Sequence, residues 1–385
     1  MARSADQMKY IYLDHAATSP LRPEARDAME PFGDVLYANP SGSHKFARDA
    51  RRAVDEARDM VAAAIGCKPG EVIFTSGGTE GANSAILGTI RRRGGQAVCT
   101  ASEHHAVLHC VEHVHGVVVP ITPEGPVDPT VVRQVLADTD KVSVVSVMAV
   151  NNETGAINDI EQVSHAVRGR AEGAVLHTDA VQAACWIDLR TVWPHVDVLT
   201  LSAHKFGGPK GVGVMVVREG ITLEPLLLGG GQERDRRSGT HNVAGIVGTA
   251  VALRVTDEQR NNEVVRIRAL RDELIHGLTS RIACAVATLS HGAGSAGTAH
   301  VCLEGLESES LLYLLDTAGV CVSAASACAS GAMEPSHVLE AMGLPAARIK
   351  GSLRFSLGHT TTQEDIYIAV ESTVKAAERL LAVKK

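Results

Sequence analysis

A lysine stands directly after an apolar run in this sequence. Lys205 ends the tetrapeptide Ser202-Ala203-His204-Lys205, which follows the residues VDVLTL. A lysine at the mouth of a buried pocket is poorly solvated, which lowers its pKa and favours Schiff-base formation with an aldehyde cofactor. The tetrapeptide taken alone is equally compatible with a surface lysine beside the Gly-Gly-Pro turn that follows.

An acid ends a second apolar run upstream. Asp179 lies in the segment AVLHTDA. An aspartate held against a pyridine nitrogen keeps that nitrogen protonated and makes the ring an electron sink. The same residue could instead cap a helix, so the cofactor interpretation depends on Asp179 lying near Lys205.

A glycine-rich turn supplies a candidate phosphate site. Gly77-Gly78-Thr79-Glu80 follows the run EVIFT and opens a helical pattern. Free backbone N–H groups and a hydroxyl at the positive end of a helix suit a phosphate. No Lys-Ser or Lys-Thr follows at Walker spacing, and no strand carries GxGxxG with an acid downstream, so the motif disfavours a nucleotide-binding protein.

These three groups end or follow the strands of one expected sheet. From about residue 70 to 217, short apolar runs alternate with helical patterns, which predicts a mostly parallel or mixed sheet covered by helices. The strands are apolar throughout, as in sheets buried on both faces. Ligands bind beyond the carboxyl ends of such strands. Four polar segments follow strands and are expected to converge there, namely TSGGTEGANS, NNETG, DAVQ and SAHKFGGPKG.

Composition excludes several classes of protein. The formal net charge is −7, which disfavours electrostatic binding of nucleic acid or anionic membrane, and we expect neither as a direct partner. No apolar run reaches the roughly 20 residues of a membrane span, and the first residues lack the apolar stretch of a signal peptide, so we expect a cytoplasmic protein. Eight cysteines occur without CxxC pairs, which signals neither a zinc ribbon nor a disulfide framework.

The second half of the chain has a different pattern. A helical stretch from about Val243 to Leu278 follows the loop LGGGQERDRRSGTHN and is expected to bridge to a second domain. Residues 283–385 show a few strands and a terminal helix, the pattern of a small α/β domain.

A series of motifs carries a family resemblance over essentially the whole chain. In order they are YLDHAATSPL, NPSGSH, FTSGGTEGAN, EHHAV, NNETG, HTDAVQ, SAHKFGGPKG, GGGQERDRRSGT, SACAS and LRFSLGHTT. The sequence resembles the cysteine desulfurases of the NifS/IscS type, within the class V aminotransferases of fold type I. The resemblance implies pyridoxal 5'-phosphate as cofactor, a homodimer, and a large domain with a mostly parallel seven-stranded sheet. It also implies domains at 17–255 and 256–385, the small one completed by residues 1–16.

The resemblance assigns a role to each matching residue of the cofactor site. Lys205 would carry the cofactor and Asp179 would pair with its pyridine nitrogen. Gln182 would contact the phenolic oxygen, and His104 would stack on the ring and help to move protons. The phosphate would be held by Gly78, Thr79, Ser202 and His204, with Thr240 reaching across from a second subunit.

The resemblance also assigns the substrate and the sulfur acceptor. Asn152 and Arg354 would receive the carboxylate of L-cysteine, with Asn39 nearby; Asn152 would also border the cofactor. Arginine suits this role because its planar fork matches a carboxylate, although Arg354 alone would be interpreted as a surface ion pair. Cys328 would attack the substrate's sulfur and become a persulfide, leaving L-alanine, and a sulfur-acceptor protein would then take the persulfide.

The tract around Cys328 departs from the family's pattern. Relatives usually carry Ser-Gly-Ser-Ala-Cys or a similar tract, whereas alanine stands at positions 324 and 325 here. Alanine has less backbone freedom than glycine, so we hypothesise a stiffer Cys328 loop with a smaller reach. Limited proteolysis that cuts this tract as readily as any exposed loop would contradict the hypothesis.

Several alternatives remain at this point. His105, His109 and His113 lie at helical spacing with Cys110 close by and could bind a metal, although no HExxH motif is present and we expect no metal site. Selenocysteine lyases, kynureninase-like lyases and aminotransferases of the same fold share the Lys205 and Asp179 arrangement. A non-catalytic sulfur-trafficking adaptor is a further possibility. The destination of the sulfur also stays open between iron–sulfur cluster assembly, tRNA thiolation and a DndA-like role in DNA phosphorothioation.

Overall fold

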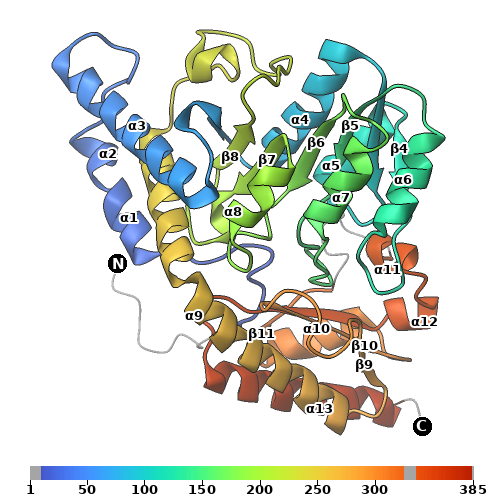
Figure 1. Cartoon of the computed structure of the whole chain (residues 1–385). Helices are drawn as coiled ribbons and strands as arrows, with labels where there is room; N and C mark the ends of the chain where they lie inside the picture. Colours follow the sequence, from blue (N-terminus) through green and yellow to red (C-terminus); the bar gives the residue numbers. More distant parts are fainter. Residues whose placement is uncertain (1–9, 325–334, 384–385) are drawn as a thin grey trace.

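The computed structural model describes residues 10–324 and 335–383 (Figure 1). Cys328 and Ala325, on which part of the sequence interpretation depends, lie outside the described residues. In the described part the chain forms two α/β parts, drawn one above the other in Figure 1, and a long helix passes from one to the other.

The upper part is built on a seven-stranded sheet, as the sequence predicted. Its strand order is β2-β8-β7-β6-β5-β3-β4. All neighbours pair in parallel except at β8, which pairs antiparallel with both β7 and β2. The strands are β2 (Val72–Thr75), β3 (Gln96–Thr100), β4 (Val117–Val119), β5 (Val142–Ser146), β6 (Val175–Asp179), β7 (Val198–Ser202) and β8 (Gly213–Val217).

Helices cover both faces of this sheet, which explains why its strands are apolar throughout. One apolar cluster joins Val72 and Phe74 to α3 and α7, and a second joins the intervening Ile73 to α4 and α5. Because successive strand residues face opposite sides, both faces are buried. The helices of this part are α1 (Pro23–Met29), α2 (Pro31–Asp34), α3 (Lys45–Ile65), α4 (Gly78–Arg93), α5 (His105–His113), α6 (Pro129–Ala137), α7 (Ile160–Arg168) and α8 (Leu189–Val192).

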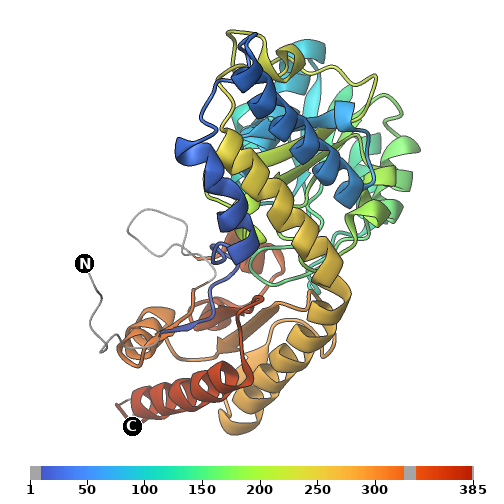
Figure 2. The ribbon, with the colours of Figure 1, turned by 90° about the vertical axis from the view of Figure 1, so that its left-hand side faces the viewer.

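Helix α9 (Val243–Arg281) connects the two parts. Its 39 residues begin at the cap Asn242, whose side chain accepts the N–H of Gly245. The first half contributes Ile246 and Leu253 to the core of the large sheet, and the second half contributes Leu270 and Leu274 to the core of the smaller part. Figure 2 shows α9 crossing from one part into the other. The bridging helix expected from the sequence is therefore present. The expected domain boundary, between residues 255 and 256, lies inside this helix.

The smaller part combines an antiparallel sheet with flanking helices. Its three strands are ordered β12-β10-β9, and the N-terminal strand β1 pairs in parallel with β11 through Ile11 and Val320. The chain's start thus lies against its last third. The elements are β1 (Ile11–Tyr12), β9 (Ala285–Ala287), β10 (Thr298–Leu303), α10 (Ser308–Thr317), β11 (Val320–Cys321), α11 (His337–Ala341), α12 (Ala346–Ile349), β12 (Ser352–Ser356) and α13 (Gln363–Val383).

Candidate functional site

A cavity opens at the carboxyl ends of the strands, between the large sheet and the smaller part. Its empty volume is about 1070 Å³, including the open mouth. Ten residues assigned from the sequence line it: Gly78, Thr79, His104, Asn152, Asp179, Gln182, Ser202, His204, Lys205 and Arg354. The rule that ligands bind beyond the carboxyl ends of parallel strands therefore located the cavity correctly.

The amine of Lys205 lies inside this cavity rather than on the surface. The short 3-10 helix Ala203–Lys205 follows β7 directly. Its Nζ donates to the backbone carbonyls of Ala16 and Ala17, at 2.6 and 2.9 Å. Gln182 Nε2 donates to the same carbonyl of Ala16, at 2.9 Å. The N-terminal segment thus holds the amine and the Gln182 amide side by side.

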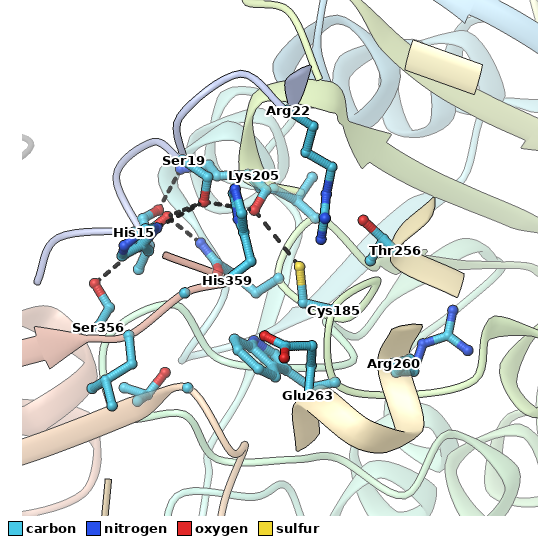
Figure 3. A pocket seen from close by; sticks show the side chains of 18 residues that line it. His15, Ser19, Arg22, Cys185, Lys205, Thr256, Arg260, Glu263, Ser356 and His359 are labelled. Atoms are coloured by element: carbon cyan, nitrogen blue, oxygen red, sulfur yellow. Dashed lines mark hydrogen bonds between the residues drawn. The ribbon is translucent and has the colours of Figure 1, made fainter. Parts of the chain in front are cut away.

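A narrower crevice lies behind Lys205 and shares Ala16, Val181 and Gln182 with the main cavity (Figure 3). From this side the hydroxyl of Ser19 donates to the Lys205 backbone carbonyl at 3.1 Å, and the thiol of Cys185 lies 3.8 Å from the same oxygen. Burial raises the pKa of Cys185 to about 11, so its sulfur stays a thiol near neutral pH. These contacts fix the backbone of Lys205.

Asp179 is the last residue of β6 and is buried. Its Oδ1 accepts the N–H of Val181 at 2.9 Å in a turn, and no helix begins there. Burial raises its pKa to about 6, while the nearby charge of Lys205 acts in the opposite direction. A buried carboxyl group of this kind is stabilised as the carboxylate by a cationic partner, and a protonated pyridine nitrogen is such a partner.

The glycine turn before α4 has the shape that a phosphate needs. A Cβ at Gly78 would lie 2.7 Å from a methyl group of Val181, so only glycine fits between α4 and the strand ends. The first N–H groups of α4, the Thr79 hydroxyl and Ser202 meet at this end of the cavity. The carboxylate of Glu80 is paired with Arg237 at 2.9 Å, which offsets the only acid in the helix's first turn.

Two histidines of the cavity are held neutral. Burial, together with the charge of Lys205, lowers the pKa of both His104 and His204 to about 4. His104 Nδ1 accepts the N–H of Ala106 at 3.1 Å, which leaves the ring proton on Nε2. His104 therefore offers an N–H at neutral pH, and His204 contributes a neutral ring that contacts the Thr18 hydroxyl at 3.1 Å.

Arg354 is buried, in contrast to the surface ion pair that its sequence context alone suggested. It lies on β12 with 5% of its surface exposed. One terminal nitrogen donates to the carbonyl of Asn152 at 3.0 Å, and the other pairs with Asp14 at 2.8 Å. Its Nε is buried without a hydrogen-bond partner among the described residues. The guanidinium is thus fixed at the wall of the cavity by the NNETG loop and the N-terminal segment.

Two of the assigned residues that the structure describes do not line this cavity. Asn39 and Thr240 are exposed, and neither is among the described residues that line the cavity. Cys328 lies outside the described residues, although Ser323 just upstream does line the cavity. Asn39 Oδ1 accepts the N–H of Ser41 in a local turn, at 2.9 Å.

Sequence reasoning assigned no role to three acids beside the site, of which one is half-buried and two are buried. They are the half-buried Asp14 and the buried Glu103 and Glu153, and each stands inside a motif in which a neighbouring residue received the role. Glu103 directly precedes His104; one of its oxygens accepts the N–H of Met148 at 2.6 Å, and burial raises its pKa to about 8. The position of each acid within a motif was the signal that could have identified it.

The histidines considered as metal ligands lie on α5. The rings of His105 and His109 stack at 4.7 Å, and the Cys110 thiol donates to the carbonyl of Ala106 at 3.2 Å. Within residues 10–324 and 335–383, no three His, Cys, Asp or Glu side chains are arranged to hold a metal ion. In the same ranges no helix is long and apolar enough to cross a bilayer.

Comparison with known proteins identifies the family. The model of the aminotransferase class-V family matches residues 11–368. The chain belongs to this family. It is 41% identical to the "IscS-like cysteine desulfurase" of Mycobacterium tuberculosis, over 96% of this chain and 96% of that protein.

Solved structures lead to the same family. A structure described as a NifS-like protein superposes with a TM-score of 0.89 at 31% identity, covering 96% of this chain and 99% of the other. A second, "SspA in complex with cysteine", has a TM-score of 0.78 at 30% identity, covering 91% of this chain and 99% of the other. The fold type, family and pyridoxal-phosphate dependence expected from the motifs are thus confirmed.

Proposed function

We propose that this chain is a cysteine desulfurase that uses pyridoxal phosphate to move the sulfur of L-cysteine onto Cys328, with release of L-alanine. The observation that carries the proposal is the cavity itself. The cavity is lined by a lysine, a buried aspartate, the glycine turn at the start of α4 and a buried arginine. The chain that forms it is about 40% identical to cysteine desulfurases.

The residues of the cavity fit the cofactor. Asp179 would hold the pyridine nitrogen, the turn at Gly78 and Thr79 would hold the phosphate together with Ser202 and His204, and Lys205 would bind the aldehyde carbon. Gln182 would contact the phenolic oxygen, and the neutral ring of His104 would cover one face. The bound cofactor supplies an electron sink, which weakens the bond between the substrate's β-carbon and its sulfur.

The chain's own groups then orient the substrate and move its protons. Arg354 and Asn152 would bind the carboxylate of L-cysteine, because the guanidinium is buried and already fixed in place. Lys205 is the base next to the substrate's α-carbon, and His104 presents its Nε2 proton to the cavity.

Cys328 is the best sulfur acceptor in the chain. Burial raises the thiol pKa of every one of the seven described cysteines, which disfavours the reactive thiolate form in each of them near neutral pH. In the proposed step the Cys328 thiolate bonds to the substrate's sulfur and the carbon–sulfur bond breaks. The β-carbon takes a proton, so cysteine plus thiol gives alanine plus persulfide without an external oxidant.

We further propose a homodimer in which Thr240 and Asn39 serve the partner's cavity. The loop that carries Thr240 is fixed by the buried ion pair between Arg58 and Glu233, at 2.8 Å. Large apolar side chains on this loop and near Asn39 are exposed, namely Leu227, Leu228, Val35 and Tyr37. Apolar groups exposed around two unused site residues favour a covered interface.

The remaining expectations are also retained as proposals. These are the division into domains at 17–255 and 256–385 with residues 1–16 joining the latter, and a cytoplasmic location. The persulfide would pass to an acceptor protein of iron–sulfur cluster assembly or of DNA phosphorothioation. A protein acceptor agrees with the net charge of −7, which disfavours direct contact with DNA.

The proposal is tested by the products formed from L-cysteine. Purified protein with cofactor should yield alanine and reducible sulfur in equal amounts, and the sulfur should first reside on the chain. Release of selenium only from selenocysteine, cleavage of kynurenine, or transfer of the amino group to a keto acid would favour the alternative enzymes of this fold. Mass spectrometry of the intact protein and amino-acid analysis separate these outcomes.

Arg354→Lys should weaken substrate binding more than it slows the reaction. Lysine keeps the positive charge but loses the planar fork and the contacts to Asn152 and Asp14. We expect the KM for L-cysteine to rise by about 10- to 100-fold, since hydrogen bonds between charged groups contribute about 1.5–3 kcal/mol. Steady-state kinetics measure the change, and an unchanged KM would remove Arg354 from the proposed substrate site.

A further inference from the structure

Residues on both sides of Cys328 in the sequence contact the groups proposed to bind the substrate carboxylate. On the upstream side, Ser323 exchanges two backbone hydrogen bonds with Arg354, at 2.7 and 3.2 Å. Ala324, the last described residue on this side, is buried. The upstream end is therefore fixed to the backbone of Arg354.

On the downstream side, Ser336 caps α11 and His337 is the first residue of this helix. Both residues make contacts with the walls of the site. Ser336 is 2% exposed; its hydroxyl donates to Glu153 Oε2 and accepts the N–H of Leu339. The neighbouring His337 contacts the carbonyl of Glu103 through Nε2, at 3.0 Å. The start of α11 is thus docked on the loops that carry Asn152 and His104.

Glu153 is a buried acid for which the proposed chemistry has no role. It is 4% exposed, and burial raises its pKa to about 7, against the effects of the Ser336 hydrogen bond and the charge of Arg354. Burying a carboxyl group is unfavourable unless it makes specific contacts. Glu153 contacts Ser336, the cap of α11. The residue before it in the chain is Asn152, whose carbonyl accepts a hydrogen bond from Arg354.

We propose that Glu153 is a positioning residue for sulfur transfer: by holding Ser336, it sets the start of α11 relative to Asn152 and Arg354. This inference rests on the proposed function, in which Cys328 lies between Ser323 and Ser336 and receives the sulfur. Ser323 contacts Arg354 and Ser336 contacts Glu153, so one set of contacts holds both of these residues beside the groups proposed to bind the substrate's carboxylate. Glu153 acts on the approach of thiol to substrate, and binding of the cofactor and of cysteine does not depend on it.

Removal of either partner should slow persulfide formation at unchanged substrate affinity. For Glu153→Ala and Ser336→Ala we expect kcat and the single-turnover rate of persulfide formation to fall by about 10- to 100-fold, because small displacements of reacting groups reduce rates by this order. The cofactor's visible absorbance and the KM for L-cysteine should stay within about threefold of the wild type. Glu153→Gln and Ser336→Thr keep the acceptor and the hydroxyl, and both should retain near-wild-type rates.

Two further variants separate positioning from general destabilisation. The double variant of Glu153→Ala and Ser336→Ala should be no slower than the slower single variant, since both remove one interaction. Ser308→Ala is the matched control, because Ser308 is also a buried serine at a helix start, and its hydroxyl donates to the Lys350 carbonyl at 2.6 Å. An equal slowing in Ser308→Ala, additive losses in the double variant, or a wild-type rate in Glu153→Ala would overturn the inference.

The failure of this inference is distinguishable from failure of the proposed function. Persulfide and alanine formed by a Cys328→Ala protein would refute the function itself, whatever the result at Glu153. A Cys328→Ala protein without persulfide, together with a wild-type rate in Glu153→Ala, would refute only the role of Glu153.

Discussion

Replacing Cys328 with serine is expected to abolish persulfide formation and sulfide release from L-cysteine while the bound cofactor keeps its visible absorbance. A serine hydroxyl is almost entirely protonated near neutral pH and does not attack the substrate's sulfur as a thiolate does. We expect the rate of sulfur release to fall by about 1000-fold or more, the order seen when a nucleophile is removed. Sulfide assays with a thiol reductant and intact-protein mass spectrometry measure the loss.

The control for this experiment is Cys321→Ser. Cys321 lies on β11, seven positions before Cys328, and burial raises its pKa like that of the other described cysteines. The control variant should therefore form persulfide at the wild-type rate. Sulfide release that survives in Cys328→Ser would point to a relative that cleaves the carbon–sulfur bond without a protein nucleophile, such as a selenocysteine lyase.

The cofactor side of the cavity was predictable from sequence because its residues follow strands. Lys205, Asp179 and the turn at Gly78 each end or follow an apolar run, and parallel strands bring their carboxyl ends to one edge. The alternative interpretation, a surface lysine beside the Gly-Gly-Pro turn, is excluded because the Lys205 amine donates to the carbonyls of Ala16 and Ala17. Those contacts join positions nearly 190 residues apart, so no local pattern could reveal them.

The substrate side was less predictable because tertiary contacts define it. The environment of Arg354 depends on Asp14, which lies just after β1 and is bridged to Ser356 at the end of β12, from the opposite end of the chain. The sequence context of Arg354 suggests exposure, and only the assembled fold buries it. The interpretation of Arg354 as a carboxylate-binding residue came from the family motif and stays a prediction, while the structure shows a buried guanidinium that Asn152 and Asp14 fix at the cavity wall.

The residues that sequence reasoning left without a role are those that connect the cofactor side of the cavity with its substrate side. Glu153 and Glu103 contact the start of α11, and both lie in motifs where a neighbouring residue was the more obvious candidate. A buried carboxyl group is recognisable only when its exposure and its partners are known. Asn39 and Thr240 illustrate the opposite case, because the roles that we propose for them require a second copy of the chain, which one sequence does not display.

Lys205→Ala is expected to remove nearly all activity and the covalent attachment of the cofactor. Alanine removes both the amine that bonds to the aldehyde carbon and the base beside the substrate's α-carbon. Loss of a general base and a covalent anchor together should lower kcat by about 1000-fold or more. Borohydride reduction followed by peptide mass spectrometry should place the cofactor's mass on Lys205 in the wild type and on no lysine in the variant.

Lys210→Ala is the matched control, because Lys210 is exposed five positions further along the same motif. It should keep both the cofactor and the activity. The Lys205→Ala protein should still bind pyridoxal phosphate noncovalently, since the variant leaves unchanged Asp179 and the turn at Gly78, which we propose to hold the two ends of the molecule. Cofactor attached to a lysine other than Lys205, or cysteine turnover that survives without its amine, would contradict the assignment of the cavity as the catalytic centre.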